Sequence, residues 1–389
     1  MLFAAAMARK RILALVTLLL ALLAATWQRA RAIEKLPPDF DEGIYLPLAY
    51  RYAEMVAGGR WGELMAYQEN FEHPPLVKLL YASELLVSGT PEPEWRTVRV
   101  GRPIPEPAVP VFRQTRWLSG VMGILQVGLT GLVHPVGALL LAFDSYHVKY
   151  TSQAYLEAVP GLFAILAVLA FERARRGARE TGQGAPFQLA PLALSGALLG
   201  FTAAGKYPYA MVIGLAFLPF LLGYARARGR VWAAFVLPAL AVFVLADPAL
   251  WPDPLGRLWA SVTFHWNYSH SEHVVRSALP WYQPLYHLTH ATPTQWHKGV
   301  FATGATVWVL LPLAAIGLPA TWRQRPVWAV WAVVGLVFLV LWSTKWAQYL
   351  LLVLPPLCVC AGMGVSTLYG LAASVLRRRA AGGEQPSRG

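Results

Sequence analysis

The 389-residue sequence has few charged residues and almost no cysteine. Asp, Glu, Lys and Arg make up 14% of the chain, and hydrophobic residues make up 56%. A typical soluble domain has about 25% charged residues. The composition therefore excludes a disordered chain, a coiled coil and a single water-soluble domain. The two cysteines are too few for a disulfide scaffold.

Several nucleotide-binding and catalytic motifs are also missing. The chain contains no GxGxxG fingerprint, no Walker A loop and no G-x-S-x-G nucleophile elbow. These motifs are typical of dinucleotide enzymes, P-loop NTPases and hydrolases, respectively. Their absence disfavours an enzyme that uses a cytosolic nucleotide and an ATP-driven transporter.

Long apolar runs take the place of these motifs. A helix needs about 20 largely apolar residues to cross a bilayer, and ten segments approach that length. We therefore expect an all-α polytopic membrane protein with about ten transmembrane helices. The candidate spans are 11–27, 117–132, 134–148, 154–171, 189–205, 207–223, 231–246, 300–320, 327–343 and 346–370.

Two parts of this pattern leave alternatives open. The segments 117–132 and 134–148 are short and are joined by a tight turn, so one broken helix is the alternative. The apolar stretch 75–88 is too short for a confident crossing, and we expect an interfacial or re-entrant helix there. The count of ten helices can therefore change by about two in either direction.

The basic residues predict the orientation in the membrane. The two termini and the segments 172–188, 224–230 and 321–326 hold 16 Lys or Arg and only three Glu, which accounts for the whole net charge of +13. Such an excess is typical of cytoplasmic loops. We expect a multi-pass protein of the plasma (inner) membrane, with both termini in the cytoplasm and no nucleic-acid partner.

This orientation places two large segments, 28–116 and 247–299, outside the cytoplasm. No internal repeat or low-complexity linker divides the chain. We expect residues 1–380 to form a single membrane domain and residues 381–389 to form a cytoplasmic tail. The basic start and apolar core of the N-terminus are also typical of a cleaved signal peptide, but a retained first helix keeps the charge pattern consistent.

Acidic residues concentrate in the first external segment, where 12 of the 20 lie between Glu34 and Glu106. We expect most of them to be solvated loop charges. The exception is the pair Asp41-Glu42, which follows a Pro-Pro pair and precedes apolar residues at helical spacing. These carboxylates are either simple helix-start charges, stabilised by the helix dipole, or catalytic groups.

A second element lies about thirty residues downstream. It is the run Glu72-His73-Pro74-Pro75-Leu76, which Lys78 follows. The Pro-Pro pair removes two backbone donors and stiffens the entry to a helix, so Glu72 and His73 are held at a fixed point. Alone, this run is only a rigid helix start. Together with the Asp-Glu pair it forms a more specific pattern.

These motifs resemble the family of membrane glycosyltransferases that includes protein O-mannosyltransferases and the aminoarabinose transferase of lipid A. In that family, the first external loop carries an Asp-Glu pair and then a Pro-Pro-Leu motif. His73 and Lys78 resemble the mannosyl branch, and the histidine at position 73 argues against an aminoarabinose donor. Looser resemblances involve Glu157, Lys206-Tyr207, Lys345 and Tyr349.

The resemblance implies a GT-C-like helical bundle. It also implies inverting transfer of a mannose-like hexose from a polyprenyl-phosphate donor to an extracytoplasmic acceptor, such as protein Ser/Thr, a glycan or a lipid. Asp41 is the implied catalytic residue, with Glu42 and Glu72 as further catalytic candidates. The expected substrate-binding residues are His73, Lys78, Lys206, Tyr207, Lys345 and Tyr349.

The chemistry of such a transfer fits these residue types. An inverting reaction needs one carboxylate base for the acceptor hydroxyl, and its transition state is oxocarbenium-like. A phosphate leaving group needs little protonation, so cations can replace the second carboxylic acid. Lys206 and Lys345 are expected at outer helix ends, where they either bind the phosphate or only snorkel to the interface.

The segment 247–299 is rich in tryptophan, tyrosine and histidine. We expect its aromatic residues to form mainly an interfacial belt. Six of the nine histidines lie between His265 and His297, but they lack a recognisable ligand pattern, so we interpret them as polar loop residues. No metal-binding residues are predicted, and the sequence is compatible with a divalent cation as a cofactor.

Two other functions stay open on the sequence. A transporter or lipid flippase is the first, although the acids crowd into outer loops rather than toward the bilayer midplane. The second is a catalytically inactive homologue that binds a glycan. An exchange of Asp41 for Asn separates the second alternative from an enzyme, because only the enzyme loses an activity.

Overall fold

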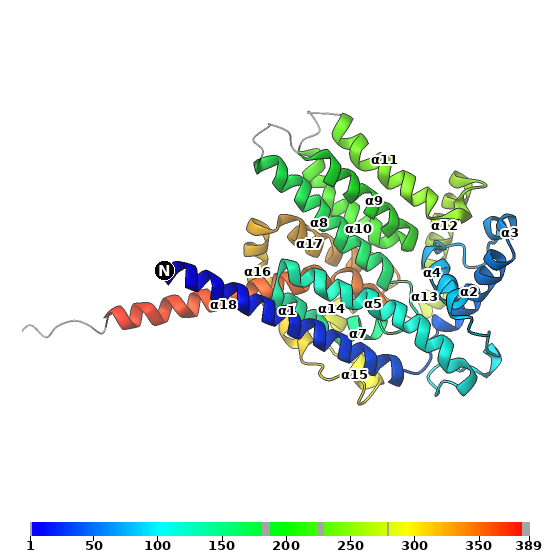
Figure 1. The fold of residues 1–389 in the computed structure, drawn as a ribbon, viewed down its shortest axis with the longest axis horizontal. Coiled ribbons are helices and arrows are strands. Elements are labelled where there is room, and N and C mark those ends of the chain that lie inside the picture. The colour runs from blue at the N-terminus through cyan, green and yellow to red at the C-terminus, as the bar shows by residue number, and fades with distance from the viewer. Residues whose placement is uncertain (1, 181–186, 224–228, 278–279, 383–389) are drawn as a thin grey trace, which may run out of the picture.

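The computed structural model describes residues 2–180, 187–223, 229–277 and 280–382, and every regular element in them is helical (Figure 1). The longer elements are α1 (Leu2–Lys35), α2 (Glu42–Ala57), α4 (Leu76–Ser88), α5 (Val109–Val133), α6 (Pro135–Phe143), α8 (Ala158–Glu180), α9 (Leu189–Gly205), α10 (Tyr207–Leu222), α11 (Gly229–Leu245), α12 (Pro254–Ser269), α16 (Thr306–Gln324), α17 (Pro326–Leu341) and α18 (Leu354–Gly382). The shorter helices are α3 (Trp61–Ala66), α7 (Ser145–Tyr150), α13 (Glu272–Ser277), α14 (Gln283–Thr289) and α15 (Thr292–Trp296). The 3₁₀ segments are η1 (Trp95–Thr97), η2 (Glu106–Ala108), η4 (Pro248–Leu250) and η5 (Ala347–Leu352).

Eight of these helices have the apolar character of membrane spans. Four are also long enough to cross a bilayer by length and composition, namely Arg11–Lys35, Glu106–Val133, Thr306–Gln324 and Leu354–Arg378. Four shorter apolar helices are Leu189–Gly205, Tyr207–Leu222, Gly229–Leu245 and Pro326–Leu341. The all-α class is therefore confirmed, and the number of ten crossings stays a prediction.

The expected span 134–148 is wrong as one continuous helix. The chain leaves α5 at His134 in an extended conformation, runs through α6, and breaks again at Asp144. The break forms because the Asp144 side chain caps α7 by accepting the backbone N–H of His147 at 2.9 Å. The next helix, α8, begins at Ala158 rather than at residue 154.

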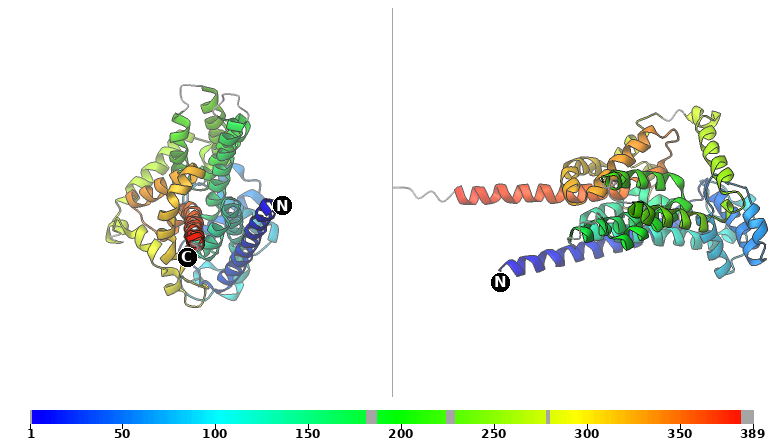
Figure 2. Two further views of the ribbon diagram at one scale, coloured as in Figure 1. Left: turned by 90° about the vertical axis from the view of Figure 1, so that its left-hand side faces the viewer. Right: turned by 90° about the horizontal axis from the view of Figure 1, so that it is seen from above.

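Outside the expected spans, the chain contains more helix than its polarity indicates. The stretch 75–88 forms α4, as predicted for a helix, and the segment 247–299 contains α12 to α15. Figure 1 shows α2, α3, α4 and α12 gathered at one end of the molecule. The N-terminus and the far part of α18 lie at the opposite end, as Figure 2 shows from a second direction. This arrangement agrees with a layout in which both termini lie on one side.

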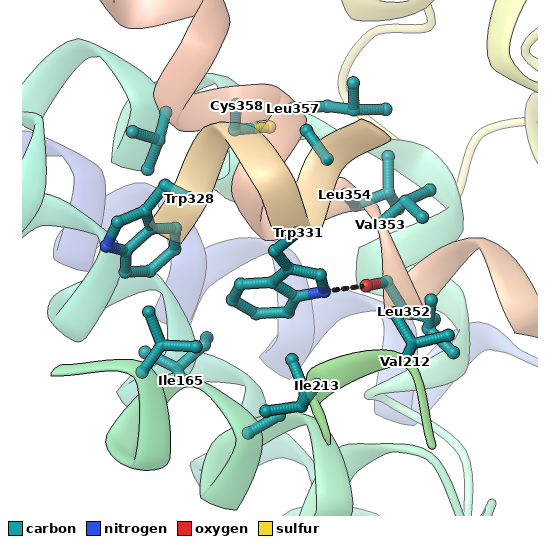
Figure 3. Packing of buried hydrophobic residues seen from close by; sticks show 14 of the residues in the cluster. Ile165, Val212, Ile213, Trp328, Trp331, Leu352, Val353, Leu354, Leu357 and Cys358 are labelled. Carbon is teal, nitrogen blue, oxygen red and sulfur yellow. Dashed lines mark hydrogen bonds between the residues drawn. The ribbon is translucent and has the colours of Figure 1, made fainter. Parts of the chain in front are cut away.

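The centre of the bundle is packed around large buried side chains. Trp328 and Trp331 of α17 are buried, and the Trp331 indole N–H donates to the carbonyl of Leu352 at 2.9 Å (Figure 3). This bond satisfies the polar atom of a buried indole. It also fastens the end of η5 to the core.

Two helices of the bundle approach each other at the level of the backbone. A Cβ atom added at Gly317 of α16 would lie 1.9 Å from the carbonyl oxygen of Cys360 in α18, and one at Gly364 would lie 2.1 Å from that of Leu313. Only glycine fits these positions. Small residues are used in this way where membrane helices pack closely.

Candidate active site

Asp41 lies at the point where the chain turns into α2. It occupies the N-cap position of the helix but makes no side-chain capping bond. Its carboxylate accepts no hydrogen bond from any residue that the structure describes. The side chain is half-buried. A carboxylate with free lone pairs at a partly buried position is available for chemistry.

A cleft of about 700 Å³ opens beside Asp41. Its walls come from the turn before α2, from α7, from the segment before η5, and from α13 to α15. The volume lies in the range typical of small-molecule sites, roughly 300–1,000 Å³. The lining includes Asp39, Asp41, Lys149, Tyr150, Tyr155, Tyr268, His273, His287, Trp296, His297, Lys345 and Trp346.

The surroundings of Asp41 favour its protonated form. Burial, followed by the nearby charge of Glu157, raises the pKa of Asp41 from 3.8 to about 7, although Lys206 works in the opposite direction. A carboxylate with a pKa near the working pH has the property that a general base needs. Perturbed groups of this kind are concentrated at functional sites.

The neighbouring acid, Asp39, is occupied by a cation. The Lys149 ammonium forms an ion pair with the Asp39 carboxylate and also donates to the Gln153 side chain at 3.0 Å. It lies 4.3 Å from the centre of the Tyr150 ring. Although burial works to raise it, the charge of Lys149 holds the pKa of Asp39 below its ordinary value. Asp39 is therefore ionised and paired beside Asp41.

Glu42, the second member of the predicted pair, is fully buried in an ion pair with Arg116. Each carboxylate oxygen accepts one guanidinium N–H, at 2.8 and 2.7 Å. The backbone N–H groups of Ala154 and Asp39 complete the set at 2.8 and 3.0 Å. The Glu42 carboxylate thus has four hydrogen bonds, and it does not line the cleft.

Arg116 binds more than this one carboxylate. Its remaining N–H groups donate to the backbone carbonyls of Ile33, Leu36 and Pro37 at 3.1, 2.7 and 3.0 Å. The ion pair therefore joins the end of α1, the Pro-Pro turn and α5 at one point. Arg116 was not among the residues that the sequence analysis singled out.

The run Glu72 to Leu76 forms the stiff entry to α4, which begins at Leu76. The buried Lys78 donates to the backbone carbonyls of Asn70 and His73, both at 3.0 Å, and to the Asn70 side chain at 3.1 Å. All three bonds hold the loop before α4. The structure therefore places Lys78 beneath the loop rather than in the cleft lining.

His73 and Glu72 lie beside the aromatic and histidine residues that surround the site. The His73 ring is 6.3 Å from Tyr45 and 5.6 Å from His265, measured between ring centres. Burial and the charge of Lys206 lower the pKa of His73 well below its ordinary value, so the ring is neutral. The Glu72 side chain accepts the Asn70 amide N–H at 2.6 Å.

Lys206 interrupts the chain between α9 and α10, and its ammonium is buried in an ion pair with Glu157. It lies 4.9 Å from the centre of the Tyr349 ring. The structure thus brings together Glu157, Lys206 and Tyr349, which come from three distant parts of the chain. Tyr207 points elsewhere and lines a separate small cavity with Tyr52 and Asp247.

Lys345 follows α17 and lines the main cleft. It is 8% exposed, and its ammonium donates to the backbone carbonyl of Trp342. No carboxylate pairs with it in the part of the chain that the structure describes. Buried charges are normally paired, so an unpaired lysine in a cleft wall favours an anionic ligand.

Sequence reasoning missed several of the cleft residues. Lys149 and Tyr155 lie within the stretch around Glu157 that the family resemblance highlighted, but only the acid was considered. His273, His287 and His297 were interpreted as loop residues, and they line the cleft. Within the described ranges, no three His, Cys, Asp or Glu side chains form a group suited to a metal ion.

Comparisons with protein-family models and with curated protein sequences give no match. Solved structures do match. ArnT from Cupriavidus metallidurans bound to undecaprenyl phosphate has a TM-score of 0.59 at 16% identity over 90% of this chain. The archaeal oligosaccharyltransferase AglB from Archaeoglobus fulgidus, in complex with an inhibitory peptide and a dolichol-phosphate, has a TM-score of 0.50 at 13% identity over 98% of this chain.

These similarities establish the fold of the chain. It is the GT-C fold of membrane glycosyltransferases, as the sequence motifs predicted. The chain spans 60% of the length of the ArnT chain and 53% of that of AglB. The helical spans and the fold together define a membrane protein.

Proposed function

We propose that this protein is an inverting glycosyltransferase that moves a mannose-like hexose from a polyprenyl-phosphate donor to a hydroxyl acceptor. The observation that carries the proposal is the carboxylate of Asp41, which is half-buried in a cleft of about 700 Å³ and accepts no hydrogen bond from the described residues. The wall of the same cleft holds Lys345, which pairs with no carboxylate in the described part of the chain. A base and a cation in one cleft are the two groups that this reaction requires. The GT-C fold supports the same conclusion.

In the proposed reaction, Asp41 removes the proton from the acceptor hydroxyl. The acceptor oxygen attacks the anomeric carbon as the bond from that carbon to the phosphate oxygen breaks. The polyprenyl phosphate leaves with the bonding electrons, and the configuration is inverted. Lys345 stabilises the charge that develops on the phosphate, so no second carboxylic acid is needed.

The other predicted site residues have supporting roles in this proposal. Glu42 fixes the turn that carries Asp41, through Arg116 and two backbone N–H groups. Lys78 fixes the loop of Glu72 and His73. Lys206 balances the charge of Glu157, and both act on Asp41 electrostatically. We propose that Glu42, Lys78 and Lys206 are positioning residues, because each already binds groups within the protein.

The proposed acceptor and membrane location are those that the sequence predicts. We propose an extracytoplasmic cleft in the plasma (inner) membrane, with both termini in the cytoplasm. The start of α1 and the end of α18 lie at the end opposite α2 to α4, which agrees with this orientation. Protein Ser/Thr, a glycan or a lipid each offers the hydroxyl that Asp41 would deprotonate.

The test is sugar transfer in proteoliposomes. Radiolabelled polyprenyl-phosphate hexoses, mannose first, are supplied with membrane protein and lipid as acceptors. We expect label to leave the carrier only when the protein is present, and the labelled fraction identifies the acceptor. If several donors are left intact, the chain is either a transporter or an inactive glycan-binding homologue. Carrier flipping and glycan binding then separate those two.

The pH dependence of sugar transfer should follow the ionisation of Asp41. The base works when ionised, and its pKa is about 7, so the rate should rise with pH and reach half its plateau near pH 7. At pH 6 about a tenth of the plateau rate is expected. The measurement is kcat/KM between pH 5.5 and 8.5. A rate that falls with rising pH would assign the titrating group to an acid instead.

Removal of the Lys345 charge should weaken donor binding. A charge-assisted hydrogen bond contributes about 1.5–3 kcal/mol, so Lys345→Gln should raise the KM for the donor by roughly 10-fold or more with an intact fold. The matched control is Lys298→Gln, which changes an exposed lysine of the second external segment. Equal KM values for the two variants would exclude Lys345 from the phosphate site.

A further inference from the structure

Helix α12 carries a row of large apolar side chains that the rest of the described chain leaves uncovered. Leu255, Trp259, Val262 and Trp266 are 82%, 71%, 50% and 69% exposed. Their spacing of four, three and four residues places them on one side of the helix. We call these four residues the α12 stripe.

The other side of α12 is fixed to the loop before α4. The Ser261 hydroxyl donates to the carbonyl of Glu72 at 3.0 Å, and a ring nitrogen of His265 lies 3.0 Å from the same oxygen. Phe264 packs edge-on against Phe71, with ring centres 5.6 Å apart. The helix therefore supports the Glu72-His73 loop and turns its stripe away from the protein.

Further exposed apolar side chains lie on the apolar helix α11, which precedes α12 in the chain. Leu237, Leu240 and Leu245 of α11 are 63%, 55% and 70% exposed, and Trp251 is exposed in the short connection to α12. The one charged residue of α12, Arg257, donates to the backbone carbonyls of Met65 and Ala249. No charge interrupts the exposed row.

We propose that α12 lies flat on the outer surface of the bilayer, with its stripe inserted at the headgroup level, and that this contact holds the Glu72-His73 loop in place. A phospholipid surface fits better than a protein partner, because the apolar helix α11 just before α12 also exposes leucines and the connection between the two helices exposes Trp251. Tryptophan is enriched at this depth, and amphipathic helices bind there by their apolar side. The proposal does not depend on the proposed activity.

Single cysteines labelled with an environment-sensitive nitrobenzoxadiazole dye test the contact. Both native cysteines are buried, so they do not compete for the dye. Val262→Cys and Trp266→Cys report on the stripe. Asn267→Cys is the matched control, since residue 267 is exposed but lies about 100° further around the helix. The labelled protein is placed in phosphatidylcholine nanodiscs with or without nitroxide-labelled acyl chains.

We expect blue-shifted emission and strong nitroxide quenching at residues 262 and 266, with water-like emission and little quenching at residue 267. Water-like emission at all three residues would overturn the proposal. So would shielding at 262 and 266 that grows with protein concentration and is insensitive to the nitroxide, because this would indicate a second copy of the chain.

The link to the loop has its own measurement. In nanodiscs, the double variant W259Q/W266Q should lose hydrogen-exchange protection at the amides of residues 70–73, where His73 donates to Asn70. Trp281→Gln, which changes an exposed tryptophan outside α12, should leave that protection intact. Unchanged protection in the double variant would show that the lipid contact does not support the loop.

Discussion

Replacement of Asp41 by Asn should reduce sugar transfer by about 10²–10⁴-fold, the range attributed to a positioned general base. The substitution keeps the size of the side chain and removes its ability to accept a proton. The loss should appear in kcat, because the acceptor and the donor still bind. The measurement is a full kinetic comparison with wild type in proteoliposomes at pH 8, where Asp41 is ionised.

The same substitution should not destabilise the protein. The pKa of Asp41 is raised by folding to about 7. Above the unfolded pKa of roughly 3.9, the ionised group therefore favours the unfolded state, and the effect is complete once the pH exceeds 7. Asp41→Asn removes it, so the Tm at pH 8 should stay level or rise.

The matched control for this experiment is Glu63→Gln, which changes an exposed acid of the same external segment. It should leave both transfer and Tm unchanged. Transfer within tenfold of wild type in Asp41→Asn would show that the base is another residue. Glu157 would then be the next candidate, because one of its oxygens is buried without a partner among the described residues. A fall in the Tm of Asp41→Asn would instead show that the substitution damages the fold.

Arg116→Ala should lower the free energy of unfolding by about 3–5 kcal/mol, the usual result of breaking one side of a buried ion pair. The change leaves the Glu42 carboxylate fully buried without its cation. It also frees three backbone carbonyls at the end of α1 and in the Pro-Pro turn. Thermal unfolding in nanodiscs, followed by circular dichroism, measures the loss.

Arg113→Ala provides the comparison, since Arg113 lies on the same helix and also pairs with a glutamate. Both partners of that pair, Arg113 and Glu34, are 53% exposed, and exposed pairs contribute about 0–1 kcal/mol. A similar loss of stability in the two variants would show that the buried Arg116 pair stabilises the fold no more than an exposed ion pair does. Glu42→Gln should lower the free energy of unfolding less than Arg116→Ala does, because the amide retains one acceptor oxygen for the guanidinium.

Much of the bundle follows from the sequence. The apolar runs predicted at 189–205 and 207–223 are α9 and α10 to within one residue. They are separated by Lys206, whose charge cannot lie in the apolar interior without a partner. The apolar runs and the lysine between them are both local features, so they can be recognised in a single sequence. Asp41, Glu157, Lys206 and Lys345 are singled out in the sequence because the short motifs around them resemble those of a known family.

The parts that were not predicted depend on contacts between distant residues. Glu42 pairs with Arg116, which lies 74 positions away, and no local pattern joins the two. Asp39 and Lys149 are 110 positions apart. The break at Asp144 occurs inside an apolar run, because a side-chain cap outweighs the helical tendency of its neighbours. A sequence shows the charges, but only the fold assigns their partners.

Under the proposed function, the bond from Trp331 to the carbonyl of Leu352 has a consequence for the choice of carrier lipid. The bond, which Figure 3 shows, ties η5 to the packed centre of the bundle. Tyr349 lies in η5, and Lys345 lies just before it. The height of Lys345 relative to the membrane is therefore set by the protein and not by the lipid. Carriers with different numbers of isoprene units would then present the same phosphate to the same ammonium. We therefore expect the protein to recognise the phosphate group of its carrier and to accept polyprenyl chains of different lengths.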